Sequence, residues 1–261
     1  MSLSNDHWAP LVKAKVEEVL ADTSFVAPTS EFSSITAPDA KFALGIDHTL
    51  LKPDATSAQI DELCDQAIRY KFKSCCVNGA NVEQVSRRLE GSGVLTCAVI
   101  GFPLGAGTTA AKAFEAKDAV TSGANEIDMV VNIGALKADN YALVYSDIRA
   151  VVDAAATTVK VILETVFLSD EEKIAASFLA AEAGAAFVKT STGFSGGGAT
   201  AADVLLMQKT VTYKSGVKVK ASAGIRSFEK SLEMFKAGAE RIGTSSGAAI
   251  MESADVAAGS Y

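Results

Sequence analysis

Residues 160–191 read KVILETVFLSDEEKIAASFLAAEAGAAFVKTS. An apolar run stands at each end of this stretch, and an Ala- and Glu-rich segment with helical composition lies between the two runs. Ser169 followed by three acidic residues is typical of a helix start. Ala-Gly-Ala at 183–185 is typical of a helix end, because glycine accepts the left-handed conformation there. The stretch therefore predicts a strand, a helix and a second, parallel strand.

The same unit recurs along the chain from Gly45 onward, at intervals of roughly 20 to 35 residues, which is the spacing of a barrel repeat. Helices are predicted over 57–70, over about 109–122 and from Ser169, and a further helix end at 237–239. Eight strands are predicted, at 45–50, 74–78, 95–101, 126–132, 160–165, 187–191, 217–222 and 241–245. The sequence thus predicts one α/β domain over residues 45–261, a (β/α)₈ TIM barrel with a C-terminal tail.

Residues 1–44 precede this pattern. They predict an amphipathic helix around 10–20 and then a Ser-, Thr- and Pro-bearing stretch over 23–38. We expect this N-terminal helical extension to pack on the barrel or over one of its ends, and we assign it no chemistry.

The composition excludes several classes of protein. A net charge of -7 and a pI near 5.0 argue against nucleic-acid binding, which requires clustered positive charge. No run approaches the roughly 18 apolar residues of a membrane helix, and the first residues lack the pattern of a signal peptide, so we expect a cytoplasmic protein.

Cysteine and histidine usage argues against a metal site. The four cysteines form no CxxC motif, and we interpret them as buried apolar residues. His7 and His48 are too few for a His-rich catalytic zinc site. We therefore expect neither a metal nor a cofactor.

Charged residues stand within the predicted strands, and this fold places its active sites at the C-terminal ends of the strands. Alternate strand residues share a face, which pairs Glu126 with Asp128, Lys160 with Glu164 and Lys218 with Lys220. With Lys189 and Asp47 they predict four lysines balanced by four carboxylates in one cavity, because buried ions need partners. The alternative is that individual lysines simply reach solvent.

Lys189 and Lys220 lie on neighbouring predicted strands. A nearby like charge lowers the pKa of the less solvated ammonium group, so Lys220 would lower the pKa of Lys189 and yield a neutral amine near pH 7. Such an amine attacks a carbonyl carbon to form an imine, and Asp128 could move protons through a water molecule. This pattern favours a metal-independent (class I) aldolase. A sugar-phosphate isomerase with a carboxylate base, and a metabolite-binding barrel without turnover, are the alternatives.

The loops after the last three predicted strands suggest a phosphate site. Thr192-Gly193, Ala223-Gly224 and residues 243–247 offer hydroxyls and backbone N–H groups where this fold commonly binds phosphate. Turn geometry alone could also explain the glycines.

Five motifs resemble the deoxyribose-phosphate aldolase family over the chain from about Gly45 onward. They are GIDHTLL at 45–51, EIDMVVN at 126–132, VILET at 161–165, FVKTSTGF at 187–194 and VKASAGIR at 219–226. The resemblance implies reversible cleavage of 2-deoxy-D-ribose 5-phosphate to D-glyceraldehyde 3-phosphate and acetaldehyde, with Lys189 forming the Schiff base. It further implies that Lys220 and Asp128 are proton donors and acceptors.

The resemblance also suggests the other site residues and the partners. The substrate and its phosphate would be bound by Thr192, Gly193, Gly224, Ser245, Ser246, Cys76, Asp47, Lys160 and Glu164. Tyr261 at the chain's end matches a family tyrosine that assists proton transfer. The partners would be small phosphosugar and aldehyde substrates, and the protein would be a homodimer or another homo-oligomer. Ala223 departs from the family pattern, which has glycine there.

Overall fold

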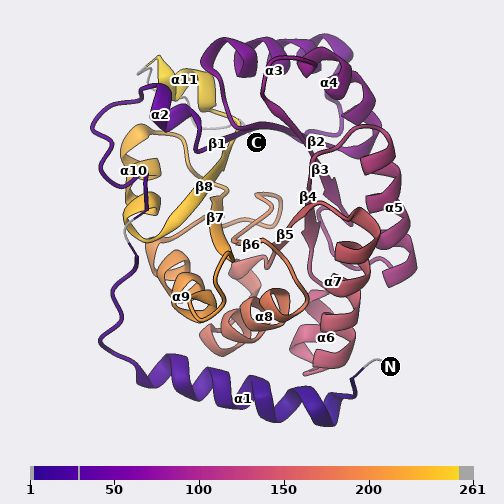
Figure 1. The fold of residues 1–261 in the computed structure, drawn as a ribbon, viewed down its shortest axis with the longest axis vertical. Helices are drawn as coiled ribbons and strands as arrows, with labels where there is room; N and C mark the ends of the chain where they lie inside the picture. Colours follow the sequence, from indigo (N-terminus) through magenta and orange to yellow (C-terminus); the bar gives the residue numbers. More distant parts are fainter. Residues whose placement is uncertain (1–2, 29, 253–261) are drawn as a thin grey trace.

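The computed structural model describes residues 3–28 and 30–252 as a closed barrel of eight parallel strands surrounded by helices (Figure 1). The strands follow one another around the barrel in sequence order. They are β1 (Ile46–Leu50), β2 (Ser74–Val77), β3 (Leu95–Ile100), β4 (Glu126–Val130), β5 (Thr158–Ile162), β6 (Phe187–Lys189), β7 (Lys218–Ser222) and β8 (Ala239–Thr244). The (β/α)₈ fold and all eight predicted strands are confirmed.

Helices connect the strands on the outside of the barrel. The predicted helix over 57–70 is present, and Thr56 caps it reciprocally with Gln59. Ser169 and Glu172 form the same reciprocal capping box at the helix start predicted at Ser169. The helices are α1 (Asn5–Ala21), α2 (Ala40–Ala43), α3 (Ser57–Tyr70), α4 (Val82–Leu89), α5 (Thr109–Thr121), α6 (Ile133–Lys137), α7 (Tyr141–Ala155), α8 (Asp170–Glu182), α9 (Ala201–Val211), α10 (Phe228–Lys236) and α11 (Gly247–Met251), with short 3₁₀ turns η1 (Gly79–Asn81) and η2 (Thr165–Phe167).

The apolar core lies between the outer face of the barrel and the helices. Ile127, Val161, Val188 and Val219 point outward from their strands and are fully buried there. Each such side chain stabilises the fold by roughly 1.5–3 kcal/mol through its removal from water. Strand alternation turns the intervening polar residues into the barrel, so the packing of the outer face determines which side chains line the interior.

One buried ion pair lies within the helical layer. Lys112 of α5 contacts Asp147 of α7 at 2.6 Å, and both side chains are almost fully buried. The same ammonium group donates a hydrogen bond to the carbonyl oxygen of Val130, at the end of β4, at 3.0 Å. The pair therefore ties two helices to the strand that carries Asp128.

Helix α1 lies outside the barrel, across α8 and its neighbours (Figure 1). Its Trp8 ring packs against Tyr145 of α7 at 4.4 Å and Phe178 of α8 at 6.3 Å between centroids. The helix begins at Asn5, earlier than predicted, with Pro10 inside it. Because α1 covers its outer side, α8 is buried without interruption over residues 174–181.

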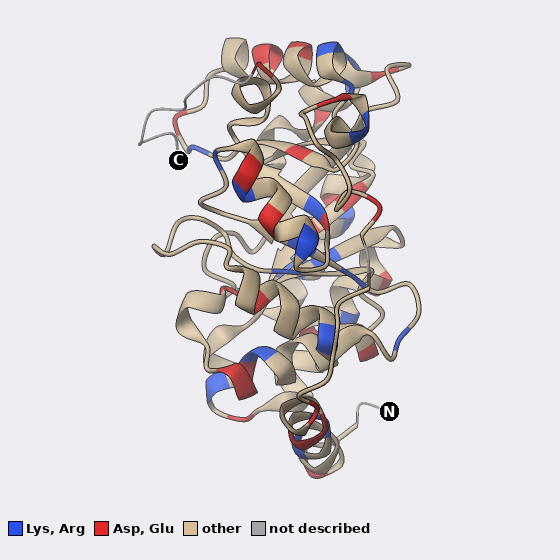
Figure 2. Cartoon of the chain, turned by 90° about the vertical axis from the view of Figure 1, so that its left-hand side faces the viewer, with Lys and Arg blue, Asp and Glu red and all other residues tan. Residues whose placement is uncertain are grey.

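The segment after α1 leads to the other side of the molecule. Phe32 stacks on Phe235 of α10 at 4.9 Å, and Phe42 of α2 meets the same ring edge-on. Basic and acidic residues are interspersed along the elements seen in Figure 2. In the described part of the chain, no helix is both long and apolar enough to cross a membrane.

Candidate active site

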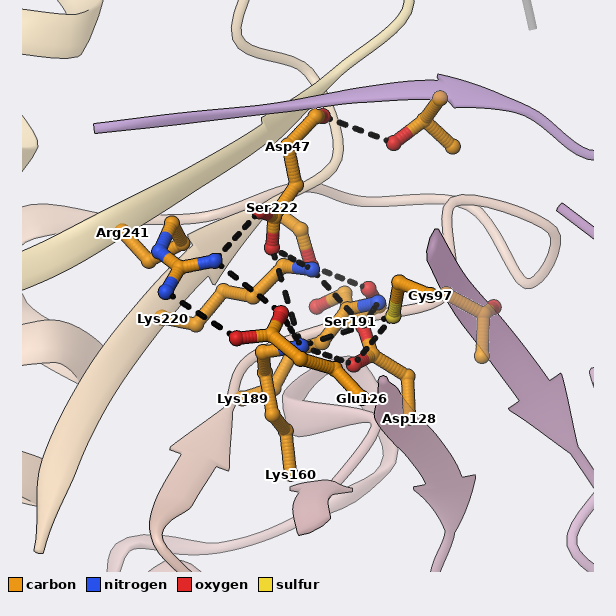
Figure 3. A network of polar contacts seen from close by, with 12 residues as sticks. Asp47, Cys97, Glu126, Asp128, Lys160, Lys189, Ser191, Lys220, Ser222 and Arg241 are labelled. Atoms are coloured by element: carbon orange, nitrogen blue, oxygen red, sulfur yellow. Dashed lines mark hydrogen bonds and ion pairs between the residues drawn. The ribbon is translucent and has the colours of Figure 1, made fainter. Parts of the chain in front are cut away.

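A buried network of ion pairs fills the interior of the barrel, with Asp128 of β4 at its centre (Figure 3). The Oδ2 atom of Asp128 accepts hydrogen bonds from Lys189 Nζ and Lys220 Nζ, both at 2.7 Å. Its Oδ1 atom accepts one from Lys160 Nζ at 2.8 Å. Three ammonium groups therefore converge on one carboxylate.

The strand register explains this convergence. Lys189 of β6 is the direct partner of Lys220 of β7, and Asp128 of β4 is the partner of Lys160 of β5. Side chains at paired positions of neighbouring strands point to the same side of the sheet. The predicted closeness of Lys189 and Lys220 is thus confirmed.

A second set of ion pairs lies against this centre. Asp47 of β1 contacts Lys220 at 2.6 Å, and Glu126 of β4 contacts Lys160 at 2.7 Å. Arg241 of β8 bridges these two carboxylates, with Nη1 at 2.6 Å from Asp47 and 3.2 Å from Glu126. Arg241 is a site residue that was not predicted from the sequence. It stands two residues before Gly243, and strand alternation turns both toward the interior.

The predicted balance of four lysines and four carboxylates is wrong in two places. Lys218 is exposed at the start of β7, where the strand has not yet entered the barrel. Glu164 forms no ion pair with any residue that the structure describes. The network instead contains three lysines and Arg241 with three carboxylates, so cations are in excess.

The excess of cations keeps the network ionised. Burial alone would raise the pKa of Asp128, but the three surrounding ammonium groups outweigh it and hold that pKa well below its ordinary value. Burial alone would lower the pKa of Lys220, but Asp128 and Asp47 outweigh it and raise the pKa. The Lys220 ammonium is therefore a fixed positive charge next to Lys189.

Two cysteines lie beside the central carboxylate. Cys76 of β2 and Cys97 of β3 are register partners, and Cys97 Sγ donates to Asp128 Oδ1 at 3.2 Å. Their sulfur atoms and a carboxylate oxygen of Asp128 lie within 4.8 Å of one another, which resembles a set of metal ligands. The ammonium groups that already contact Asp128 would repel a metal cation at this position. Cys97 was not predicted from the sequence as a site residue.

The predicted phosphate loops surround the rim of the barrel. Gly193 and Gly224 have left-handed backbones, with φ of 87° and 73°. The Ser246 hydroxyl is buried and, among the described residues, has no hydrogen-bond partner. Ser245 lines a cavity of about 430 Å³ over the end of β1, which Phe194 and Leu51 also border.

Ala223 occupies a strained position in this rim. Its φ of 78° is left-handed, a conformation in which a side chain clashes with the backbone. Its carbonyl oxygen accepts a hydrogen bond from the Ala199 N–H at 2.9 Å. A Cβ on Gly198 would lie 2.9 Å from the same oxygen. The methyl of Ala223 therefore strains the turn without preventing the close approach of the glycine-rich loop.

Glu164 and Thr192 lie together on the rim. Glu164 Oε1 accepts from the Thr192 N–H at 3.2 Å, and the Thr192 hydroxyl donates to Oε2. Tyr261 lies outside the described residues.

The arrangement suits amine chemistry on a carbonyl compound. Lys189 Nζ contacts the Asp128 carboxylate, which also binds the positively charged Lys220. The Lys189 side chain is about 5% exposed. The carboxylate can exchange protons with a bound compound through a water molecule. Neutral backbone N–H groups on the rim suit an anionic end of the same substrate.

Comparison with known proteins places these residues in context. A family model described as "DeoC/LacD family aldolase" matches residues 41–253. A deoxyribose-phosphate aldolase of Lysinibacillus sphaericus is 60% identical over 215 residues, which is 82% of this chain and 96% of the relative. One of Streptococcus sanguinis is 58% identical over 217 residues, 83% of this chain and 97% of the relative.

Solved structures of deoxyribose-phosphate aldolases are also similar to this chain. A chain from Coccidioides immitis, assigned as a deoxyribose-phosphate aldolase, is 41% identical with a TM-score of 0.88 and covers 97% of this chain and 98% of its own length. A tetrameric deoxyribose phosphate aldolase from Aeropyrum pernix is 33% identical with a TM-score of 0.78, covering 85% of this chain and 94% of its own.

Proposed function

This chain belongs to the DeoC/LacD aldolase family, and from that premise we propose that it cleaves 2-deoxy-D-ribose 5-phosphate reversibly to D-glyceraldehyde 3-phosphate and acetaldehyde. The observation that carries the proposal is the pair of lysines, Lys189 and Lys220, sharing one oxygen of Asp128 at 2.7 Å each. Relatives named for this reaction, at 58–60% identity, support the choice of substrate.

Lys189 is the nucleophile. Its neutral amine adds to the aldehyde carbon of the open-chain sugar, and loss of water gives a protonated imine. The imine draws electrons from the bond between the second and third carbons, which breaks as the hydroxyl on the third carbon loses its proton. Glyceraldehyde 3-phosphate leaves, and the remaining enamine is protonated and hydrolysed to acetaldehyde.

Asp128 and Lys220 manage protons and charge. Asp128, an ionised carboxylate with the protonated Lys160 and Lys220 as neighbours, accepts the hydroxyl proton through a water molecule and returns a proton to the enamine. Lys220, held protonated by Asp128 and Asp47, disfavours a second charge on Lys189. Tyr261 assists the proton transfer from the tail.

The substrate's phosphate lies at the rim, beside Gly193, Gly224, Ser245 and Ser246. The Ser246 hydroxyl, which has no hydrogen-bond partner among the described residues, supports this placement, because a buried donor needs an acceptor. The rest of the binding set comprises Cys76, Asp47 and Lys160. Thr192 and Glu164, which hydrogen-bond to each other on the rim, support this set without contacting the substrate. We further propose a cytoplasmic homo-oligomer. The four free, buried cysteines suit a reducing compartment, and the tetrameric relative supports association.

Reductive trapping tests the proposal directly. The protein is incubated with acetaldehyde and borohydride, and the modified peptide is mapped by mass spectrometry. We expect a two-carbon adduct on Lys189, which Lys189→Leu abolishes together with cleavage of the sugar phosphate. Lys218→Leu, the same change at an exposed lysine of β7, is the matched control and should keep both. Cleavage at a near-normal rate by Lys189→Leu would rule out the imine.

A further inference from the structure

Glu164 adopts a backbone conformation that side chains rarely tolerate. Its φ of 59° and ψ of 64° lie in the left-handed region, two residues after the end of β5, and the residue is completely buried. This conformation costs a non-glycine residue roughly 1–2 kcal/mol and persists only where surrounding contacts determine it. The contacts of the Glu164 carboxylate are therefore the place to look for its role.

Among residues 3–28 and 30–252, the hydrogen bonds that Glu164 accepts come from the loop that follows β6. The Thr192 N–H donates to Oε1 at 3.2 Å, the Thr192 hydroxyl donates to Oε2, and the Ser195 hydroxyl donates to Oε2 at 3.2 Å. Asp47, Glu126 and Asp128 each contact lysine or arginine, whereas Glu164 forms no ion pair within the described residues. Glu164 thus binds a loop rather than a cation.

These contacts use up the donors of Thr192. Its N–H and its O–H both face Glu164, and its Oγ1 accepts a hydrogen bond from the Phe194 N–H at 3.0 Å. Gly193, which lies between Thr192 and Phe194, has a left-handed φ of 87°, and no described residue accepts a hydrogen bond from its N–H. Thr192 therefore has no donor to offer a substrate, whereas Gly193 has one.

We propose that Glu164 and Thr192 form a lock that holds residues 192–195 so that the Gly193 N–H faces the substrate's phosphate. Both are positioning residues in this proposal, which rests on the proposed function. The lock also explains how a buried carboxylate can lie near a phosphate site. Hydrogen bonds from the loop occupy its oxygens and reduce its repulsion of a second anion. The lock makes the enzyme selective for phosphorylated substrates.

The sharpest test replaces Thr192 by residues of similar size. Thr192→Val keeps the shape and removes the hydroxyl, whereas Thr192→Ser keeps the hydroxyl. Steady-state kinetics are compared for 2-deoxyribose 5-phosphate and for unphosphorylated 2-deoxyribose. Thr192→Val removes the hydrogen bond donated to Glu164 and the one accepted from the Phe194 N–H. We expect it to raise KM for the phosphorylated sugar at least about tenfold, which corresponds to about 1.4 kcal/mol, with little change in kcat. KM for unphosphorylated deoxyribose should stay constant, and Thr192→Ser should recover most of the loss.

Glu164→Gln distinguishes the hydrogen bonds of the lock from repulsion between the Glu164 carboxylate and the phosphate. Glutamine keeps the shape but cannot accept all three hydrogen bonds, so KM for the phosphorylated sugar should rise. A fall in KM would mean that the carboxylate acts by repelling the phosphate, and would overturn the lock. Glu171→Gln, at an exposed position of α8, is the control for the substitution itself.

Trapping with acetaldehyde distinguishes failure of the lock from failure of the proposed function. Acetaldehyde carries no phosphate, so the Thr192 and Glu164 variants should form the Lys189 adduct at the rate of the unaltered protein. Intact trapping together with an equal KM change for both sugars, or with none, would overturn the lock alone. Absence of the adduct from the unaltered protein would instead remove the function on which the lock rests.

Discussion

Replacing Lys220 by Met should shift the pH dependence of imine formation upward. Lys189 Nζ and Lys220 Nζ each lie 2.7 Å from Asp128 Oδ2, so they are separated by no more than twice that distance. At this limit and an effective dielectric constant of about 20, two unit charges repel by about 3 kcal/mol. Removal of the Lys220 charge therefore favours protonated Lys189 by about that amount, and the neutral fraction near pH 7 falls about a hundredfold.

The assay is the initial rate of borohydride-trapped adduct with acetaldehyde, measured from neutral to strongly alkaline pH. The half-maximal rate of Lys220→Met should appear about two pH units higher than that of the unaltered protein, and the two rates should converge at high pH. Lys218→Met, on the same strand but exposed, should leave the profile in place. A uniform slowing of Lys220→Met at every pH, without displacement of the profile, would refute the electrostatic argument and indicate a packing defect.

Two further predictions concern stability, and both are checked by urea unfolding. Ala223→Gly should raise the free energy of unfolding by about 1 kcal/mol, because glycine accepts the φ of 78° without steric strain; a loss of stability would contradict this. Lys112→Met should lower it by about 3–5 kcal/mol, because Asp147 is left buried without its cation. The double variant Lys112→Met with Asp147→Leu should recover much of that loss, whereas additive losses would mean that the two residues act independently.

The sequence predicts the barrel well because its signals are local. The strands are short, largely apolar runs, and several helices begin at a residue whose side chain caps the helix, as Thr56 does for α3. The strand ends are less predictable: β5 runs over Thr158–Ile162 instead of 160–165, since Glu164 leaves the extended conformation. A left-handed glutamate carries no sequence signature of its own.

The site, too, is predicted from the sequence only where its contacts follow from local patterns. Period-two alternation places Glu126 with Asp128, and adjacent strands bring Lys189 to Lys220, so these contacts follow from the sequence. Alternation also pairs Lys218 with Lys220 on one face, but it does not say where along the strand the barrel interior begins. The role of Arg241 depends on its reaching Asp47, which is 194 positions away in the chain. Such contacts require the closed barrel.

Because α1 covers α8, a chain that lacks α1 would expose part of α8. The family model matches residues 41–253, a range that leaves α1 out. A chain cut to that range would leave Phe178 and Tyr145 without Trp8, and would turn one side of a helix buried over residues 174–181 toward water. Exposed apolar surface of that kind promotes aggregation. We therefore expect a chain that starts at residue 41 to aggregate more readily than one that keeps α1.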